Sequence, residues 1–84
     1  MPPYSIEWLD EAKADVRAVD RPTAMRLFES ILHFACTGSG DVKALHGDMA
    51  GAFRLRRGDY RILFKLEQNT MRIFGVRHRS EAYR

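Results

Sequence analysis

The hydrophobic pattern is clearest between residues 53 and 64, where apolar residues and arginines alternate around Gly58-Asp59. A period of two is typical of a half-buried β-strand, and glycine tolerates the positive φ of a tight hairpin turn. The stretch therefore predicts two antiparallel strands joined at Gly58-Asp59. A slip by one residue would mix apolar and charged side chains, so the pattern specifies the register. The predicted pairs are Arg57 with Tyr60, Arg56 with Arg61, Leu55 with Ile62, Arg54 with Leu63 and Phe53 with Phe64.

This register places three arginines, Arg54, Arg56 and Arg61, on the face opposite the apolar side chains. Arg56 lies directly across from Arg61, and like charges that face one another destabilise a hairpin. We therefore expect this face to lie open to solvent and to bind an anion.

The patterns upstream predict a short strand and two helices. Residues 4–8 alternate between apolar and polar, as a strand does. Apolar residues then recur at helical spacing over residues 9–19, with acidic residues in the first turn. Asp20 is the predicted N-cap of a second amphipathic helix over residues 24–35, which the glycines of 37–40 end.

Residues 41–51 are predicted to form a loop, 67–70 a polar turn, and 71–76 a further strand that pairs back on the hairpin. The order β-α-α-β-β-β predicts an α+β fold, with a two-helix hairpin packed on one face of a mainly antiparallel, roughly four-stranded sheet. The predicted core consists of Ile6, Trp8, Val16, Leu27, Phe28, Ile31, Leu55, Ile62, Phe64 and Ile73.

Composition narrows the class of protein. The chain has 84 residues, of which 45% are hydrophobic and 30% charged, as expected of one soluble domain spanning 1–84. It has no apolar run near the roughly 20 residues of a membrane span, and no signal-peptide pattern at its start. The lone Cys36 fits a reducing cytoplasm, and its place in the second helix predicts a buried thiol. No Cys/His spacing predicts a metal site.

Charge is distributed unevenly along the chain. Residues 1–51 hold five Lys/Arg against eight Asp/Glu, whereas residues 52–84 hold nine against three. Clustered basic charge is typical of a protein with a polyanionic partner. The acidic side chains of the helices are interpreted as a solvated surface, namely Asp10, Glu11, Asp15 and Glu29.

Several motifs of the second half carry a family resemblance. They are Leu45-His46-Gly47, Phe53-Arg54-Leu55-Arg56, Gly58-Asp59-Tyr60-Arg61 with the apolar strand after it, and the run from Val76 to Tyr83. With them the chain resembles the RelE/ParE toxin superfamily over nearly its whole length, and most closely its RelE-type branch.

The resemblance implies a bacterial toxin of a type II toxin–antitoxin system. RelE-type members enter the ribosomal A site and cut mRNA there, through attack of a 2′-hydroxyl on the neighbouring phosphate. At the matching positions, Arg54 and Arg56 would bind RNA phosphate, and Arg61, Arg77 and Tyr83 would be catalytic. The implied partners are a protein antitoxin, in a hetero-oligomer, and the ribosome with its mRNA, without a cofactor, a metal or a membrane.

Side-chain chemistry constrains how such a reaction would run. It needs a base for the 2′-hydroxyl, cations for the charge on the phosphoryl oxygens, and an acid for the leaving oxygen. Arginines meet only the second need, because they stay charged and do not accept protons. The best-known family member has lysines where this chain has Arg54 and Arg56. The base would then be Tyr83, His78, or the substrate and ribosome themselves.

The direction of two side chains at the end of the chain is left open. A regular last strand points Arg77 with Ile73 toward the helices and His78 with Arg61, whereas a bulge at Gly75 or an earlier strand end reverses this. Both Arg77 and His78 are therefore candidate catalytic residues. The alternative functions are a ParE-like toxin that poisons DNA gyrase without cutting RNA, and a degenerate homologue that only binds its antitoxin.

Overall fold

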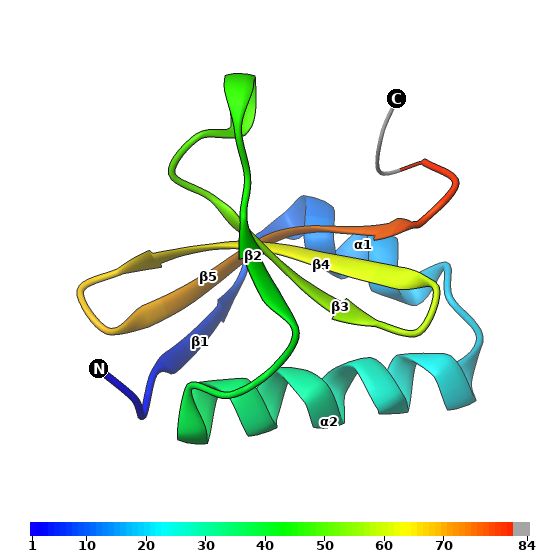
Figure 1. The fold of residues 1–84 in the computed structure, drawn as a ribbon. Helices are drawn as coiled ribbons and strands as arrows, with labels where there is room; N and C mark the ends of the chain where they lie inside the picture. The colour runs from blue at the N-terminus through cyan, green and yellow to red at the C-terminus, as the bar shows by residue number, and fades with distance from the viewer. Residues whose placement is uncertain (82–84) are drawn as a thin grey trace.

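The computed structural model describes residues 1–81. These residues form five strands, two α-helices and one 3₁₀ turn, in the order β1 (Ser5–Trp8), α1 (Asp10–Arg17), α2 (Arg21–Thr37), β2 (Val42–Ala44), η1 (Gly47–Met49), β3 (Phe53–Arg57), β4 (Tyr60–Glu67) and β5 (Thr70–His78). The sheet has the order β1-β5-β4-β3-β2, and its β1–β5 pair is parallel. Figure 1 shows α2 below the sheet and α1 behind it. The predicted α+β class, with two helices on a mainly antiparallel sheet, is confirmed.

The sheet has five strands rather than about four, because residues 42–44, which were predicted as loop, form the edge strand β2. β2 pairs with β3, and three residues are too few to show a hydrophobic period of their own. Residues 45–52, which include η1, connect β2 to β3 and are called the η1 excursion below. Figure 1 shows this excursion rising from the sheet on the side away from α2.

The helix α2 has the ends that the sequence predicts. The Asp20 carboxylate accepts hydrogen bonds from the Thr23 N–H at 3.1 Å and the Thr23 hydroxyl at 2.9 Å, which confirms it as the N-cap. At the other end Gly38 adopts a left-handed φ of 77°, and its N–H donates to the Phe34 carbonyl at 2.7 Å. Cys36 was predicted to be buried but is exposed, because it lies outside the stripe of α2 that faces the sheet.

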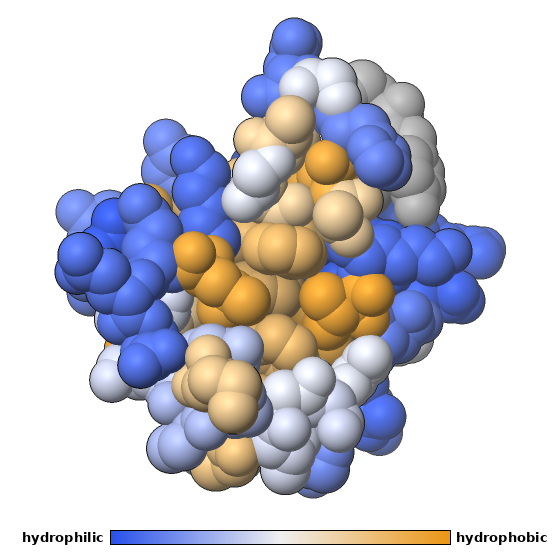
Figure 2. Space-filling view, turned by 60° about the vertical axis from the view of Figure 1, so that its left-hand side comes forward, coloured by the Kyte–Doolittle hydropathy of each residue, from blue (hydrophilic) through white to orange (hydrophobic). Residues whose placement is uncertain are grey.

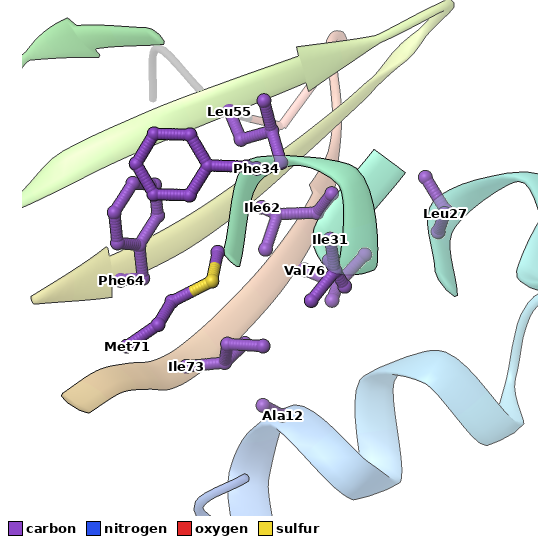
Figure 3. Close-up of a cluster of buried hydrophobic side chains, with 10 residues drawn as sticks. All are labelled: Ala12, Leu27, Ile31, Phe34, Leu55, Ile62, Phe64, Met71, Ile73 and Val76. Carbon is purple, nitrogen blue, oxygen red and sulfur yellow. The ribbon is translucent and has the colours of Figure 1, made fainter. Parts of the chain in front are cut away.

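The hydrophobic core lies between α2 and the sheet (Figure 3). Four buried members of the core were not predicted from the sequence, namely Ala12, Phe34, Met71 and Val76. Phe34 and Met71 are the largest of them, at 5% and 0% exposure. The rings of Phe34 and Phe64 meet with their centroids 5.2 Å apart. Burial of a side chain of this size contributes roughly 1.5–3 kcal/mol. Of the predicted core, Ile6, Trp8, Val16 and Phe28 are only partly buried, and the rest are buried as predicted.

The predicted hairpin register is confirmed pair for pair, from Phe53–Phe64 to Arg57–Tyr60. The strand β5, by contrast, is irregular. Phe64 pairs with Ile73 but the preceding Leu63 pairs with Gly75, so Phe74 is the extra residue of a β-bulge. After the bulge, each side chain of β5 points to the face of the sheet opposite to the one it would have in a regular strand.

Because of this bulge, Arg77 pairs with Arg61, and His78 pairs with Tyr60. The regular-strand alternative is therefore wrong, and the bulged one is right, with the extra residue at Phe74 rather than at Gly75. Arg77 joins the basic side of the sheet, while Val76 takes the core-facing position opposite Ile62.

Candidate functional site

The face of the sheet opposite α2 carries three arginines side by side on three neighbouring strands. Arg56 of β3 pairs with Arg61 of β4, which pairs in turn with Arg77 of β5. Neighbouring strands lie about 4.8 Å apart, so three arginine positions lie in one line across the sheet. We call Arg56, Arg61 and Arg77 the arginine row. Such an arrangement is unfavourable unless an anion screens it.

Arg61, in the middle of the row, is buried at 7% exposure. Its Nη1 donates long hydrogen bonds to the carbonyl oxygens of Gly58, at 3.4 Å, and Tyr60, at 3.3 Å. Its Nε is buried and has no hydrogen-bond partner within the part of the chain that the structure describes. A buried donor left unpaired costs about 1–3 kcal/mol, and more when it is charged. An incoming oxyanion would supply the missing acceptor.

Arg54 lies next to the row on β3 and is also largely buried, with 13% of its side chain exposed. Its Nη1 has no hydrogen-bond partner among residues 1–81, and the Asp41 carboxylate stands 3.8 Å from it. The expectation of an arginine face open to solvent is therefore wrong for Arg54 and Arg61. Arg56 alone of the three predicted arginines is exposed.

The cover over these arginines is the η1 excursion. Between it and the sheet is a hollow of about 460 Å³ that is lined by both apolar and cationic residues. Its walls are formed by Lys43, Ala44, Leu45, His46, Met49, Arg54, Arg61 and Leu63. The hollow therefore combines positive charge with apolar surface.

Arg77, at the other end of the row, is partly buried and firmly held. Its Nη1 donates to the Asp15 carboxylate of α1 and, at 3.1 Å, to the Val76 carbonyl. Asp15 was interpreted as part of a solvated acidic surface, and this interpretation is wrong, because its side chain is bonded to β5. No sequence pattern reveals the contact, since 62 residues separate the two partners.

His78 lies at the end of β5 beside Tyr60, with the ring centroids 5.3 Å apart in an edge-on contact. The Ser80 N–H donates to His78 Nδ1 at 3.2 Å, and the Ser80 hydroxyl lies 2.9 Å from the same nitrogen. His78 thus points away from the arginine row in the sheet register. Even so, His78 and Arg77 both line a hollow of about 340 Å³ at this end of the sheet. Tyr83, the remaining candidate, lies outside the described residues.

Residues 1–81 bring together no group of three or more His, Cys, Asp or Glu side chains that could hold a metal ion. Neither helix in that range is long and apolar enough to cross a membrane.

Solved structures show the same fold in other proteins. The toxin–antitoxin complex RelBE2 from Mycobacterium tuberculosis contains a chain that is 26% identical, with a TM-score of 0.85 over 96% of this chain and 97% of that one. The archaeal RelE–RelB complex from Pyrococcus horikoshii contains one that is 19% identical, with a TM-score of 0.77 over 95% and 99% of the two chains.

Sequence comparison gives the family. Toxin RelG of Mycobacterium tuberculosis is 30% identical over 92 aligned positions, which cover 98% of each chain. The family model described as the ParE toxin of the type II toxin–antitoxin system parDE matches residues 6–83. The chain therefore belongs to the ParE toxin family of type II toxin–antitoxin systems, within the RelE/ParE superfamily.

Proposed function

We propose that this toxin is an mRNA interferase, which enters the ribosomal A site and cuts the mRNA there. The observation that carries the proposal is the arginine row, with Arg61 buried at its centre and its Nε without a partner among the described residues. An arginine that is buried and incompletely bonded is best explained by a ligand that completes its hydrogen bonds. Phosphate matches the guanidinium in both charge and geometry.

The row would act on the charge that develops on the phosphoryl oxygens during attack by the 2′-hydroxyl. Fixed positive donors that already point at this charge lower the barrier without reorganising during the reaction. Arg61 and Arg77 take this role, while Arg54 and Arg56 position the RNA backbone. None of the four accepts a proton, so the base is His78, Tyr83 or a group of the ribosome. This division of labour predicts activity that depends on the ribosome.

The partner that restrains the toxin is proposed to be a protein antitoxin. Two of the similar solved structures are complexes named as toxin with antitoxin, and two more are named as complexes of RelE with RelB and of YoeB with YefM. Figure 2 shows an apolar patch left uncovered between hydrophilic margins on one side of the molecule. Uncovered apolar patches mark protein–protein contacts. We propose a cytoplasmic toxin–antitoxin hetero-oligomer that releases the toxin onto ribosomes.

A ParE-like poison of DNA gyrase is the second candidate. The specific observation in its favour is the matching family model, whose description names the ParE toxin. A degenerate homologue that only binds its antitoxin is the third candidate. Arg54 and Arg56, where the best-known family member has lysines, keep it open because an arginine does not exchange a proton as a lysine can.

Primer extension on a reporter mRNA in a translation extract separates the first two candidates. An interferase gives discrete in-frame cuts that appear only when ribosomes are present. A gyrase poison leaves the mRNA intact and instead causes supercoiled plasmid to be cleaved by purified gyrase. Intact mRNA in the presence of translating ribosomes overturns the proposed function.

A further inference from the structure

The Asp15 carboxylate joins helix α1 to the edge of β5 at two points. Its Oδ2 accepts the Val76 N–H at 2.9 Å and also accepts a hydrogen bond from Arg77 Nη1. The neighbouring strand β1 reaches only as far as Trp8, which pairs with Ile73. Beyond that point β5 has no strand on this side, and the Asp15 side chain takes the place of one.

Gly75 provides the surface on which the Arg77 guanidinium rests. Gly75 does not have a positive φ, so its backbone conformation is open to any residue. A Cβ built on Gly75 would stand 3.0 Å from Arg77 Nη1, 3.3 Å from Cζ and 3.4 Å from Nη2. A Cβ here would require the guanidinium to move by a few tenths of an ångström, so the glycine provides space rather than a special conformation. Its missing side chain is what lets the guanidinium lie against the strand.

The hydrogen bonds of Arg77 leave part of its head group available. Within residues 1–81, its bonds to Asp15 and to the Val76 carbonyl both start from Nη1. The side chain keeps 35% of its surface exposed. A guanidinium carries five N–H donors, so Nη2 and Nε retain donors for a phosphate.

We propose that Asp15 and Gly75 are positioning residues that hold the Arg77 guanidinium in place at the end of the arginine row. The inference rests on the proposed function, in which Arg77 contacts the RNA. Positioning has value because small displacements of a group that acts on the transition state cause large losses of rate. A fixed guanidinium also loses less rotamer entropy when the phosphate arrives.

The sign of the effect distinguishes positioning from simple electrostatics. Removal of an acidic side chain beside a phosphate site makes the site more positive, which by charge alone strengthens RNA binding. Positioning predicts the opposite outcome for the reaction. Asp15→Ala should lower the single-turnover rate of cleavage of ribosome-bound mRNA by about 10- to 100-fold. Gly75→Ala should lower it similarly, because the new methyl group displaces the guanidinium.

A double-mutant cycle with Arg77→Ala tests whether Asp15 acts through Arg77. The expected result is that Asp15→Ala causes no further loss of rate in the Arg77→Ala background. The matched control is Asp10→Ala, which removes an exposed acid from the same helix and should leave the rate unchanged. A wild-type rate in Asp15→Ala, or an equal loss with and without Arg77, overturns the proposal. A role in stability alone would give that equal loss.

A second readout does not depend on cleavage. In ¹⁵N NMR of the whole chain, the Arg77 Nε–H should be ordered in the wild type and mobile in Asp15→Ala and Gly75→Ala. An equally ordered Nε–H in all three proteins overturns the positioning role even if mRNA is cut. A wild-type protein that cuts no mRNA overturns the proposed function, whereas loss of order in the two variants still supports the positioning role.

Discussion

On the face of the sheet that α2 covers, Ile62 and Phe64 are fully buried among apolar side chains, whereas on the opposite face Arg61 is buried with a charged head group. The side chains of Ile62 and Phe64 carry no polar group, so their burial leaves no hydrogen bond unmade. Arg61 has two long hydrogen bonds and a buried Nε that lacks a partner in residues 1–81. Neighbouring positions of one strand thus follow different rules. The apolar face stabilises the fold, whereas under the proposed function the basic face binds a ligand at the expense of stability.

The largest effect is expected from Phe64→Ala, which tests whether the apolar face of the sheet stabilises the fold. Phe64 is 0% exposed, and truncation of a buried phenylalanine typically costs 3–5 kcal/mol. A domain of this size has little stability beyond that, so we expect the variant to be largely unfolded in urea titrations followed by circular dichroism. Leu32→Ala is the control, since Leu32 is 56% exposed and should change the free energy of unfolding by under about 0.5 kcal/mol. Equal losses in both variants would contradict the assignment of the core.

Arg61→Ala tests whether the arginine row on the basic face acts in cleavage. Removal of one fixed donor to a developing negative charge typically lowers a rate by about 10²–10³-fold. We expect a loss of this size in the cleavage of ribosome-bound mRNA, with the circular dichroism spectrum unchanged. Arg57→Ala is the matched control, because Arg57 lies on the same hairpin but outside the arginine row and pairs with Tyr60. Full cleavage activity in Arg61→Ala would show that the row is not the reacting site.

The two faces also differ in how far the sequence predicts them. The hairpin register follows from strict alternation, because a slip would bury charge. The core residues Leu27 and Ile31 follow from the helical spacing of α2. The bulge at Phe74 cannot be located from the sequence, since the pattern around Phe74 and Gly75 is equally compatible with a regular strand. The partner of Arg77 is equally hidden, because Asp15 comes from a helix far away in the sequence. Motif resemblance identified the arginines, and only the three-dimensional structure shows which of them are buried.

A smaller effect is expected at the exposed end of the row. Arg56→Ala removes a solvated charge, so it should weaken RNA binding about equally for all sequences. The slope of log affinity against log salt concentration should fall by roughly 0.7–0.9, the contribution of one phosphate contact. Fluorescence anisotropy with a short single-stranded RNA at several salt concentrations measures this slope. An unchanged slope would place Arg56 outside the RNA path.

The smallest effect concerns the helix that covers the apolar face. Hydrogen bonds from the Thr23 hydroxyl and N–H lower the pKa of Asp20 from its ordinary value of 3.8. A lowered pKa in the folded state means that the charged cap stabilises the fold above this ordinary value, and that the contribution is lost as the pH falls through the folded pKa. Asp20→Ala should therefore lower the melting temperature at pH 7, with a smaller difference at pH 3. A difference that is equal at both pH values, or an altered cleavage rate, would contradict this role.

The most direct test of the central claim is the free energy of unfolding of Arg61→Met, measured beside its cleavage rate. Methionine fills a similar volume without a charge, and replacement of buried charged groups by apolar ones is often neutral or stabilising by about 1–4 kcal/mol. We predict that Arg61→Met is at least as stable as the wild type and no longer cuts ribosome-bound mRNA. A variant that is markedly less stable and still cuts mRNA would show that Arg61 serves the fold, and would contradict the division between the two faces.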